Sequence, residues 1–266
     1  MSGSHPAPAQ GAALWWVAFQ TIVRKEVSRV LRIWGQTLLP PAITMTLYFV
    51  IFGAFIGSRV GQVGGVAYID FLVPGLVMMA VITNSYGNVS SSFFGSKFGR
   101  YVEELQVSPV PDWVILAGYV TGGVLRGVLV GLIVIGVSLC FTRVPVAHPF
   151  LIVLTLLLTA VVFSLAAFIN ALYAKKFDDV AIVPNFVLTP LTYLGGVFYT
   201  ITLLPPFWQQ VSLLNPILYM VNAFRYGFLD KSDVPVGASI GLTLLLIIVL
   251  TGFCLKLMQK GTGLRS

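Results

Sequence analysis

The sequence predicts an all-α membrane protein with six transmembrane helices, an N-terminal amphipathic interfacial helix and short re-entrant helices before the last span. Of the 266 residues, 57% are hydrophobic and only 9% are charged, and the mean hydropathy is +0.92. Soluble domains carry about 25% charged residues, so the surface of this chain has to face lipid. Apolar runs of about 20 residues also recur along the chain, which is the length that crosses the hydrocarbon core of a bilayer.

Two segments precede the first span. Residues 1–13 are small and polar, which is typical of a disordered tail, and they lack the apolar core of a signal peptide. Residues 14–34 repeat apolar side chains at helical spacing, with basic side chains on the opposite side. A helix with aromatic anchors on one face and cations on the other lies in the membrane interface. The apolar stripe consists of Trp16, Phe19, Val23, Val27, Val30 and Trp34, and the basic face of Lys25, Arg29 and Arg32.

Residues 14–266 are expected to form a single transmembrane domain. The pair Pro40 and Pro41 predicts a sharp turn from the interfacial helix into the first span. The fifth span contains Pro184, Pro190 and the pair Gly195-Gly196, so we expect a kinked or two-part helix there. The six spans are expected at residues 37–57, 69–94, 113–141, 150–173, 180–201 and 236–257.

The stretch 201–229 is apolar but interrupted by prolines. Pro205-Pro206 and Asn215-Pro216 divide it into pieces that are too short for a complete span. Short helices that dip into the outer leaflet would satisfy the backbone polar groups locally. We therefore expect a re-entrant segment on the outer side, directly before the last span.

The basic residues are distributed unevenly over this topology. With the N-terminus inside, eleven of the sixteen Lys and Arg residues fall on the cytoplasmic side and four on the outer side. Cytoplasmic loops carry an excess of Lys and Arg, so both termini are expected in the cytoplasm. The same rule explains the net charge of +7 better than nucleic-acid binding does, because the sequence has no basic patch interleaved with aromatic residues. No nucleic-acid partner is expected.

The third span carries glycines at four-residue spacing. Such a face lets helices approach closely within lipid. Packing within the chain and contact between subunits both explain the pattern, and we favour packing within the chain. The glycines concerned are Gly118, Gly122, Gly123, Gly127 and Gly131.

Arg126 is the charged residue nearest to the middle of a span. Burying it unpaired would cost at least a few kcal/mol, so we expect it to face an internal cavity or a partner. A role in a substrate pathway and a role in structural pairing are both open. The acidic residues fall mostly at the ends of spans, where they are solvated, and none is expected at the midplane, where ion-coupled transporters usually bury carboxylates.

No catalytic residues and no metal site are expected. His5 and His148 have no plausible partners in the sequence, and Cys140 and Cys254 lie within apolar runs, as core residues do. The chain contains no Gly-Lys pair, so it lacks the P-loop that holds nucleotide phosphates. No cofactor is expected on this chain.

The loop at 95–112 is the longest charged segment between spans on the expected cytoplasmic side. Tyr101–Val107 is expected to form a short helix that ends before Pro109. A short amphipathic helix on such a loop is suited to docking a soluble partner. A solvated loop without a partner explains the same pattern, so both interpretations are open at this point.

Three motifs in order along the chain carry a resemblance. They are Asp70-Phe71-Leu72-Val73-Pro74-Gly75, then Arg100-x-x-Glu103-Glu104-Leu105-x-x-Ser108-Pro109, and then Asn215-Pro216-x-x-Tyr219 followed by Arg225-Tyr226-Gly227. In these motifs the chain resembles ABC-2-type permeases, the membrane subunits of a large class of ABC exporters. The resemblance covers essentially the whole chain except residues 1–13.

The resemblance implies a homodimer in a bacterial inner membrane that works with two copies of a separate ABC ATPase, which bind the ATP and magnesium. It implies that the loop after the second span contacts the ATPase, that the interfacial helix with Lys25, Arg29 and Arg32 also touches it, and that the short outer helices close a gate. The implied coupling residues are Arg100, Tyr101, Glu103, Glu104, Leu105 and Pro109, and the implied gate residues are Pro205, Pro206, Phe207, Trp208, Asn215, Pro216, Tyr219 and Arg225.

The leading interpretation is a permease subunit of an ATP-driven exporter, with drugs, lipids or glycans as the implied cargo classes and no enzymatic activity of its own. The main alternative is a stand-alone secondary transporter, which predicts an internal repeat and transport without an ATPase. An intramembrane enzyme would need clustered His, Asp, Cys or Ser side chains, and the sequence shows no such cluster.

Overall fold

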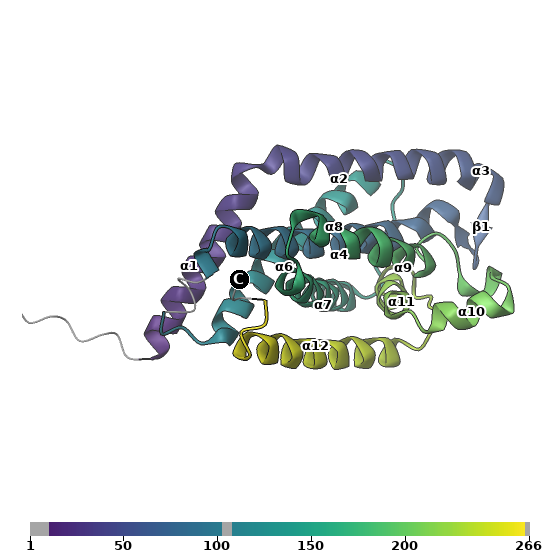
Figure 1. Ribbon diagram of the computed structural model, residues 1–266. Coiled ribbons are helices and arrows are strands. Elements are labelled where there is room, and N and C mark those ends of the chain that lie inside the picture. The colour runs from purple at the N-terminus through teal and green to yellow at the C-terminus, as the bar shows by residue number, and fades with distance from the viewer. Residues whose placement is uncertain (1–10, 103–107, 264–266) are drawn as a thin grey trace, which may run out of the picture.

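The computed structural model describes residues 11–102 and 108–263. It is a bundle of long helices, with α2 (Trp34–Tyr48) along one edge and α12 (Val236–Gln259) along the opposite edge (Figure 1). Between them lie α4 (Tyr68–Phe98) and α7 (Pro149–Tyr173). The helix α1 (Ala12–Arg32) crosses one end of the bundle, and a short β-hairpin lies at the other (Figure 1). The expected all-α membrane fold is confirmed.

Five helices are long and apolar enough to cross a membrane. The first is continuous from Trp34 to Val60, because α2 runs on as a π-helix, η1 (Phe49–Ile56), and then as α3 (Gly57–Val60). The other four are α4, α6 (Asp112–Ser138), α7 and α12. Their centres agree with five of the six predicted spans, and their ends differ by a few residues.

The predicted fifth span is not a single helix. It is divided into α8 (Phe177–Val183), the π-helix η2 (Pro184–Leu188) and α9 (Thr189–Leu194). A turn with Gly196 at φ 73 follows, and then the 3₁₀ turn η3 (Ile201–Leu203). The expected break is confirmed. Its cause is the pair of prolines Pro184 and Pro190, which remove backbone N–H donors from the helix. No helix of spanning length occupies this part of the described chain.

Two local expectations need correction. Pro40 and Pro41 do not make a turn, since both lie inside α2; the chain changes direction at Ile33, between α1 and α2. The prolines are accommodated because proline already has a helical φ, and helices in membranes tolerate the lost hydrogen bond. The β-hairpin was not predicted. It pairs β1 (Gln62–Val63) with β2 (Val66–Ala67) through Gly64 and Gly65, both at positive φ, as a tight hairpin turn requires.

The helix α4 forms the centre of the core. Its side chains pack against α6 on one side and α7 on another, and Leu72, Leu76 and Val81 are fully buried. It also buries Asn84 and Asn88. Amide groups removed from water need hydrogen-bond partners, so the polar side chains of α4 indicate where other elements attach to it.

The glycine face of α6 packs within the chain, as favoured from the sequence. A Cβ atom on Gly118 would lie 2.6 Å from Cγ2 of Ile22 on α1, and one on Gly122 would lie 2.7 Å from Cβ of Glu26. Gly131 faces Val81 of α4 in the same way. The absence of side chains therefore allows α1 and α4 to approach α6 closely.

The two edge helices remain largely uncovered. In the most apolar stretches of both Trp34–Val60 and α12, only 17% of the residues are buried, against 78% in α4. Exposed side chains on these two helices include Ile43, Phe55 and Ile248. Apolar surfaces of this kind are stable against lipid or against another membrane subunit.

Candidate functional site

Glu26 of α1 is completely buried at the contact between α1, α4 and α6. Its carboxylate accepts hydrogen bonds from Nδ2 of Asn88 at 3.2 Å and from the hydroxyl of Ser92, both on α4. It also forms an ion pair of 3.0 Å with Arg29. A buried carboxylate is tolerated only when it is paired and hydrogen-bonded, so this network fixes the position of α1 on α4.

The basic residues of α1 do not all face away from the protein. Arg29 donates to the side chain of Asn88 at 2.8 Å, and Lys25 donates to Ser96 at 2.9 Å. Arg29 is half-buried in this contact, whereas Lys25 and Arg32 are exposed. The predicted basic face is therefore wrong for Arg29, which packs on polar groups of α4, while Lys25 stays exposed and reaches α4 only with its amino group.

The end of the bundle at which α4 ends and α6 begins is called the loop end below. Here Lys97 of α4 donates to the carbonyl oxygens of Leu172 and Ala174, each at 2.7 Å, at the C-terminus of α7. A cation at a helix C-terminus satisfies carbonyls that have no partner within the helix. The ring of Phe98 lies 5.1 Å from that of Phe177, at the start of α8. Three elements thus meet at the loop end.

Three of the six predicted coupling residues are described, and they lie at this loop end. Arg100 follows Gly99, the C-cap of α4, and its φ of 61 ends the helix in a left-handed conformation. The side chains of Tyr101 and Pro109 are exposed on either side of the undescribed segment. The remaining three, Glu103, Glu104 and Leu105, fall within residues 103–107 and so lie outside the described residues.

Arg126 has a partner, as expected. Its Nη2 donates to Oδ1 of Asn84 on α4 at 3.2 Å, and its side chain is half-buried. It also lines a cavity of about 120 Å³ between α1 and α6, together with Glu26 and Val30. The structure thus provides both the partner and the cavity that were considered as alternatives.

The opposite end of the bundle, where the β-hairpin lies, is called the hairpin end below. Two short helices are found here: α10 (Pro206–Leu213), which follows Pro205, and α11 (Pro216–Leu229), which follows Asn215. The Asn215 side chain accepts from the backbone N–H of Ile217 at 3.0 Å, and proline occupies the first helical position. This is the favoured start of a helix, and it explains the Asn-Pro motif by local structure.

The predicted gate residues divide into exposed and buried groups. Phe207 and Trp208 are exposed and pack edge to face at 5.4 Å. Tyr219 donates to the carbonyl oxygen of Leu213 at 2.9 Å and so joins α11 to α10. Arg225 is buried, with only 2% of its surface exposed. The gate residues therefore share the hairpin end, but they do not form one cluster.

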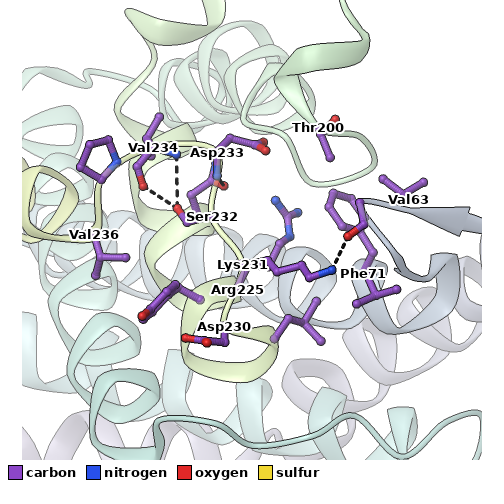
Figure 2. A pocket seen from close by; sticks show the side chains of 16 residues that line it. Val63, Phe71, Thr200, Arg225, Asp230, Lys231, Ser232, Asp233, Val234 and Val236 are labelled. Carbon is purple, nitrogen blue, oxygen red and sulfur yellow. Dashed lines mark hydrogen bonds between the residues drawn. The ribbon is translucent and has the colours of Figure 1, made fainter.

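A cavity of about 810 Å³ opens at the hairpin end beside Arg225. The hairpin, the start of α4, the end of α11 and the loop 230–235 enclose it (Figure 2). Arg225 donates from Nη2 to the carbonyl oxygen of Gly196 at 2.6 Å, and its guanidinium carbon lies 3.8 Å from the centre of the Phe71 ring. Arg225 thus connects α11 to the turn after α9 and to α4.

An exposed polar clip holds α7 against α11 beside this cavity. Nε2 of His148 and Oδ1 of Asp230 are 3.0 Å apart, and the His148 ring stacks on Tyr226. The hydrogen bond from His148, followed by one from Tyr226, holds the pKa of Asp230 below its usual range. The same carboxylate raises the pKa of Tyr226. The clip therefore contains an ionised Asp230 at neutral pH.

Glu26 and Asn88 are the residues that sequence reasoning missed. Neither residue was assigned a role from the sequence. One signal was available: Asn84, Asn88 and Ser92 follow one another at four-residue spacing, which places them on one face of a helix. Such a polar stripe in an apolar span predicts a polar partner from another element.

Comparison with known proteins identifies relatives of the whole chain. Residues 17–229 match the family model described as ABC-2 type transporter. The chain is 58% identical over 253 residues to the inner membrane transport permease YadH of Escherichia coli K12, an alignment that covers 95% of this chain and 99% of that protein. It is also 26% identical over 199 residues to nodulation protein J of Rhizobium meliloti, which covers 73% of this chain and 75% of that protein.

Proposed function

Because this chain belongs to the ABC-2 type transporter family, we propose that it is the membrane permease subunit of an ATP-driven exporter in a bacterial inner membrane. In this proposal two copies of the chain form the translocation pathway. Two copies of a separate ABC ATPase bind the ATP and magnesium and drive the transport. The membrane assignment is supported by the five apolar helices and by the name of the E. coli relative.

The course of α4 is the observation that carries the proposal. This helix has 31 residues and is therefore about 46 Å long. It begins beside the hairpin-end cavity, where Phe71 contacts Arg225, and it ends at the loop end with Lys97. A push on the loop after α4 would therefore be transmitted to the cavity by a single long helix, 78% buried in its most apolar stretch, as alternating access requires.

The network around Glu26 gives the ATPase a second route to α4. Because α1 is joined to α4 through Asn88 and Arg29, a protein that contacts both α1 and the loop after α4 would move them as one body. Basic residues also gather at the loop end, near the C-termini of three helices. They are Lys97 in α4, Lys175 after α7 and Lys256 in α12. Excess positive charge favours the cytoplasm, so we infer that the loop end is cytoplasmic.

The uncovered helix edges support a dimer. Both Trp34–Val60 and α12 present apolar faces that the single chain does not bury. A homodimer would cover one of these faces and leave the other for lipid. The exposed residue Tyr193 of α9 lies beside the first span, where its hydroxyl group is 3.3 Å from that of Tyr48.

A charge reversal in the loop after α4 tests the coupling. The double variant Glu103→Lys, Glu104→Lys is compared with Asp178→Lys, which reverses an exposed charge on α8. The permease and its ATPase are co-expressed, copurified and reconstituted into liposomes. We expect the double variant to lose ATPase copurification and the permease-dependent change in ATP hydrolysis, and Asp178→Lys to keep both.

Two outcomes would contradict the proposal. If the double variant copurifies with the ATPase and supports the same ATP hydrolysis as the wild type, the coupling assignment is wrong. If liposomes that contain the permease alone, without any ATPase, transport a cargo down an ion gradient, the protein is a secondary transporter.

A further inference from the structure

The turn that follows α12 packs against the end of α7. The backbone N–H of Thr262 donates to the carbonyl oxygen of Leu257 at 3.0 Å, and Gly261 and Gly263 have φ values of 66 and 70. These are the features of a helix that ends in a left-handed turn. A Cβ atom on Gly263 would overlap the carbonyl oxygen of Leu172, in the last turn of α7. Glycine at this position therefore allows the backbone that follows α12 to lie directly on the backbone of α7.

Lys97, near the C-terminus of α4, contacts the same carbonyl oxygen. Its Nζ donates to the carbonyl oxygens of Leu172 and Ala174, each at 2.7 Å, and to that of Ala171 at 3.4 Å. A lysine ammonium has three donors, and the last carbonyls of a helix have no partner within it. The same Nζ would lie 3.5 Å from a Cβ atom on Gly263. The ends of α4, α7 and α12 thus meet at the carbonyl oxygen of Leu172, and this contact is called the three-helix junction below.

Buried side chains hold α12 at the three-helix junction. The buried residues of this helix form one group near its start and one near its end, which are Ser239 and Thr243, and Cys254, Leu257 and Met258. Sγ of Cys254 lies 3.7 Å from the carbonyl oxygen of Leu165 in α7. The side chains between the two groups are exposed or only partly buried. The helix α12 is therefore attached to the bundle at its two ends.

Two of the helices that meet at the junction also line the hairpin-end cavity. Phe71 of α4 and Val236 of α12 lie on opposite sides of this cavity (Figure 2). Two long helices, of 31 and 24 residues, are thus joined at one end of the bundle and separated by a cavity at the other. This arrangement lets the cavity change its width by a rigid-body movement of the helices about the junction.

We propose that Lys97 and Gly263 are positioning residues, which make the ends of α4, α7 and α12 move as one unit when the ATPase displaces the loop after α4. This inference rests on the proposed function as an ABC permease. Lys97 is the penultimate residue of α4, so a displacement of that loop acts directly on the junction. Without the junction, α4 would move at the loop end while α7 and α12 stayed in place, and the displacement would not reach both sides of the cavity.

Three variants of the full-length permease test the junction. Lys97→Met removes the donors but keeps a long side chain, and Lys97→Arg restores a cation with several donors. Gly263→Ala adds the Cβ atom that overlaps the carbonyl oxygen of Leu172. Lys260→Met is the control for the lost charge, because Lys260 is exposed directly after α12. Gly252→Ala is the control for the added methyl group, since nothing lies within 4 Å of it.

The first measurement separates binding of the ATPase from coupling. The permease and its ATPase are copurified and reconstituted into liposomes, and both the recovery of the ATPase and the permease-dependent change in ATP hydrolysis are measured. We expect all variants to recover as much ATPase as the wild type. The permease-dependent change should fall about tenfold in Lys97→Met and Gly263→Ala, because charge-assisted hydrogen bonds at the junction are lost. Lys97→Arg and the two controls should keep most of it.

The second measurement needs no ATPase. Nitroxide labels are attached to Ser91→Cys on α4 and Lys256→Cys on α12, both at exposed positions, after Cys140→Ser has removed the exposed native cysteine. Pulsed electron paramagnetic resonance then gives the distribution of distances between the labels. We expect this distribution to broaden in Lys97→Met and Gly263→Ala and to stay unchanged in the controls. A wild-type permease that binds no ATPase would contradict the proposed function, whereas the label distances would still test the junction.

Three results would overturn the proposal. The first is a label distance distribution that is the same in both junction variants as in the wild type. The second is wild-type coupling in both junction variants. The third is a loss of ATPase recovery in parallel with the loss of coupling, which would make Lys97 a contact of the ATPase. Gly263→Ala keeps the test decisive if Lys97→Met fails to fold, because Gly263 lies in the turn after the last helix.

Discussion

Asn88 of α4 donates a hydrogen bond to Glu26 of α1 over 3.2 Å, at a point where the carboxylate is completely buried. Arg29 binds both members of this pair, through the carboxylate of Glu26 at 3.0 Å and the amide oxygen of Asn88 at 2.8 Å. The three residues therefore form a closed polar unit between two helices that are 62 residues apart in sequence at this contact. This unit makes α1 part of the rigid body that contains α4.

Replacing Glu26 by Ala should destabilise the protein strongly. The change leaves Arg29 and Asn88 without their common partner, and removing one member of a buried ion pair costs about 3 kcal/mol or more. We expect the unfolding temperature of the purified protein to fall by about 5 °C or more. Arg24→Ala is the control, because Arg24 is exposed on the same helix. Equal unfolding temperatures for the two variants would show that the network contributes little.

The long helices could be predicted from sequence, because hydrophobicity in a span is set by the lipid and not by the details of packing. The face of α1 that packs against the other helices could not be predicted from the sequence. Side-chain periodicity identified an amphipathic helix, but the partner of Lys25 and Arg29 is a polar stripe on another helix, and such pairing depends on tertiary structure. The same holds for Arg225, which the motif placed at the gate and which the structure buries against Phe71. The coupling and gate roles themselves remain predictions.

Gly75 allows α4 to touch the backbone that follows α9. A Cβ atom at this position would lie 2.5 Å from the carbonyl oxygen of Val197. Because that neighbour is backbone, it cannot turn aside, and Gly75→Ala should cost about 1–3 kcal/mol through overpacking. Gly87→Ala in the same helix has nothing within 4 Å of the added atom, so it should be neutral or stabilising. Unfolding temperatures measured in detergent compare the two variants, and equal losses would contradict the close approach.

Arg126 and Asn84 should be coupled energetically. Their hydrogen bond of 3.2 Å lies within the bundle, so each single replacement by Ala already removes it, and the double variant should lose less than the sum of the two. A coupling of about 1 kcal/mol is expected from a double-mutant cycle of unfolding free energies. The cycle of Arg126→Ala with Thr83→Ala serves as the control, because Thr83 is exposed and bonds its own helix. Additivity in the Asn84 cycle would mean that Arg126 is held by other contacts.

The clip between His148 and Asp230 should fail in acid. Its hydrogen bonds hold the pKa of Asp230 below the usual range, first through His148 and then through Tyr226. The carboxylate therefore stays ionised in the folded protein at a pH where it would be protonated in the unfolded chain. The resulting stabilisation is complete above the ordinary Asp pKa of about 3.9, and it is lost as the pH falls through the lower pKa of the folded state.

Asp230→Asn reproduces the protonated state at every pH. It should therefore unfold at a lower temperature than the wild type at neutral pH, and the difference should shrink and vanish as the pH is lowered below about 3.9. His148→Ala removes the main cause of the lowered pKa of Asp230, so this variant should be less stable than the wild type at neutral pH and should lose less stability as the pH is lowered. Unfolding temperatures recorded from neutral to acidic pH measure both effects. A difference between wild type and Asp230→Asn that stays constant with pH would show that the Asp230 charge does not stabilise the clip.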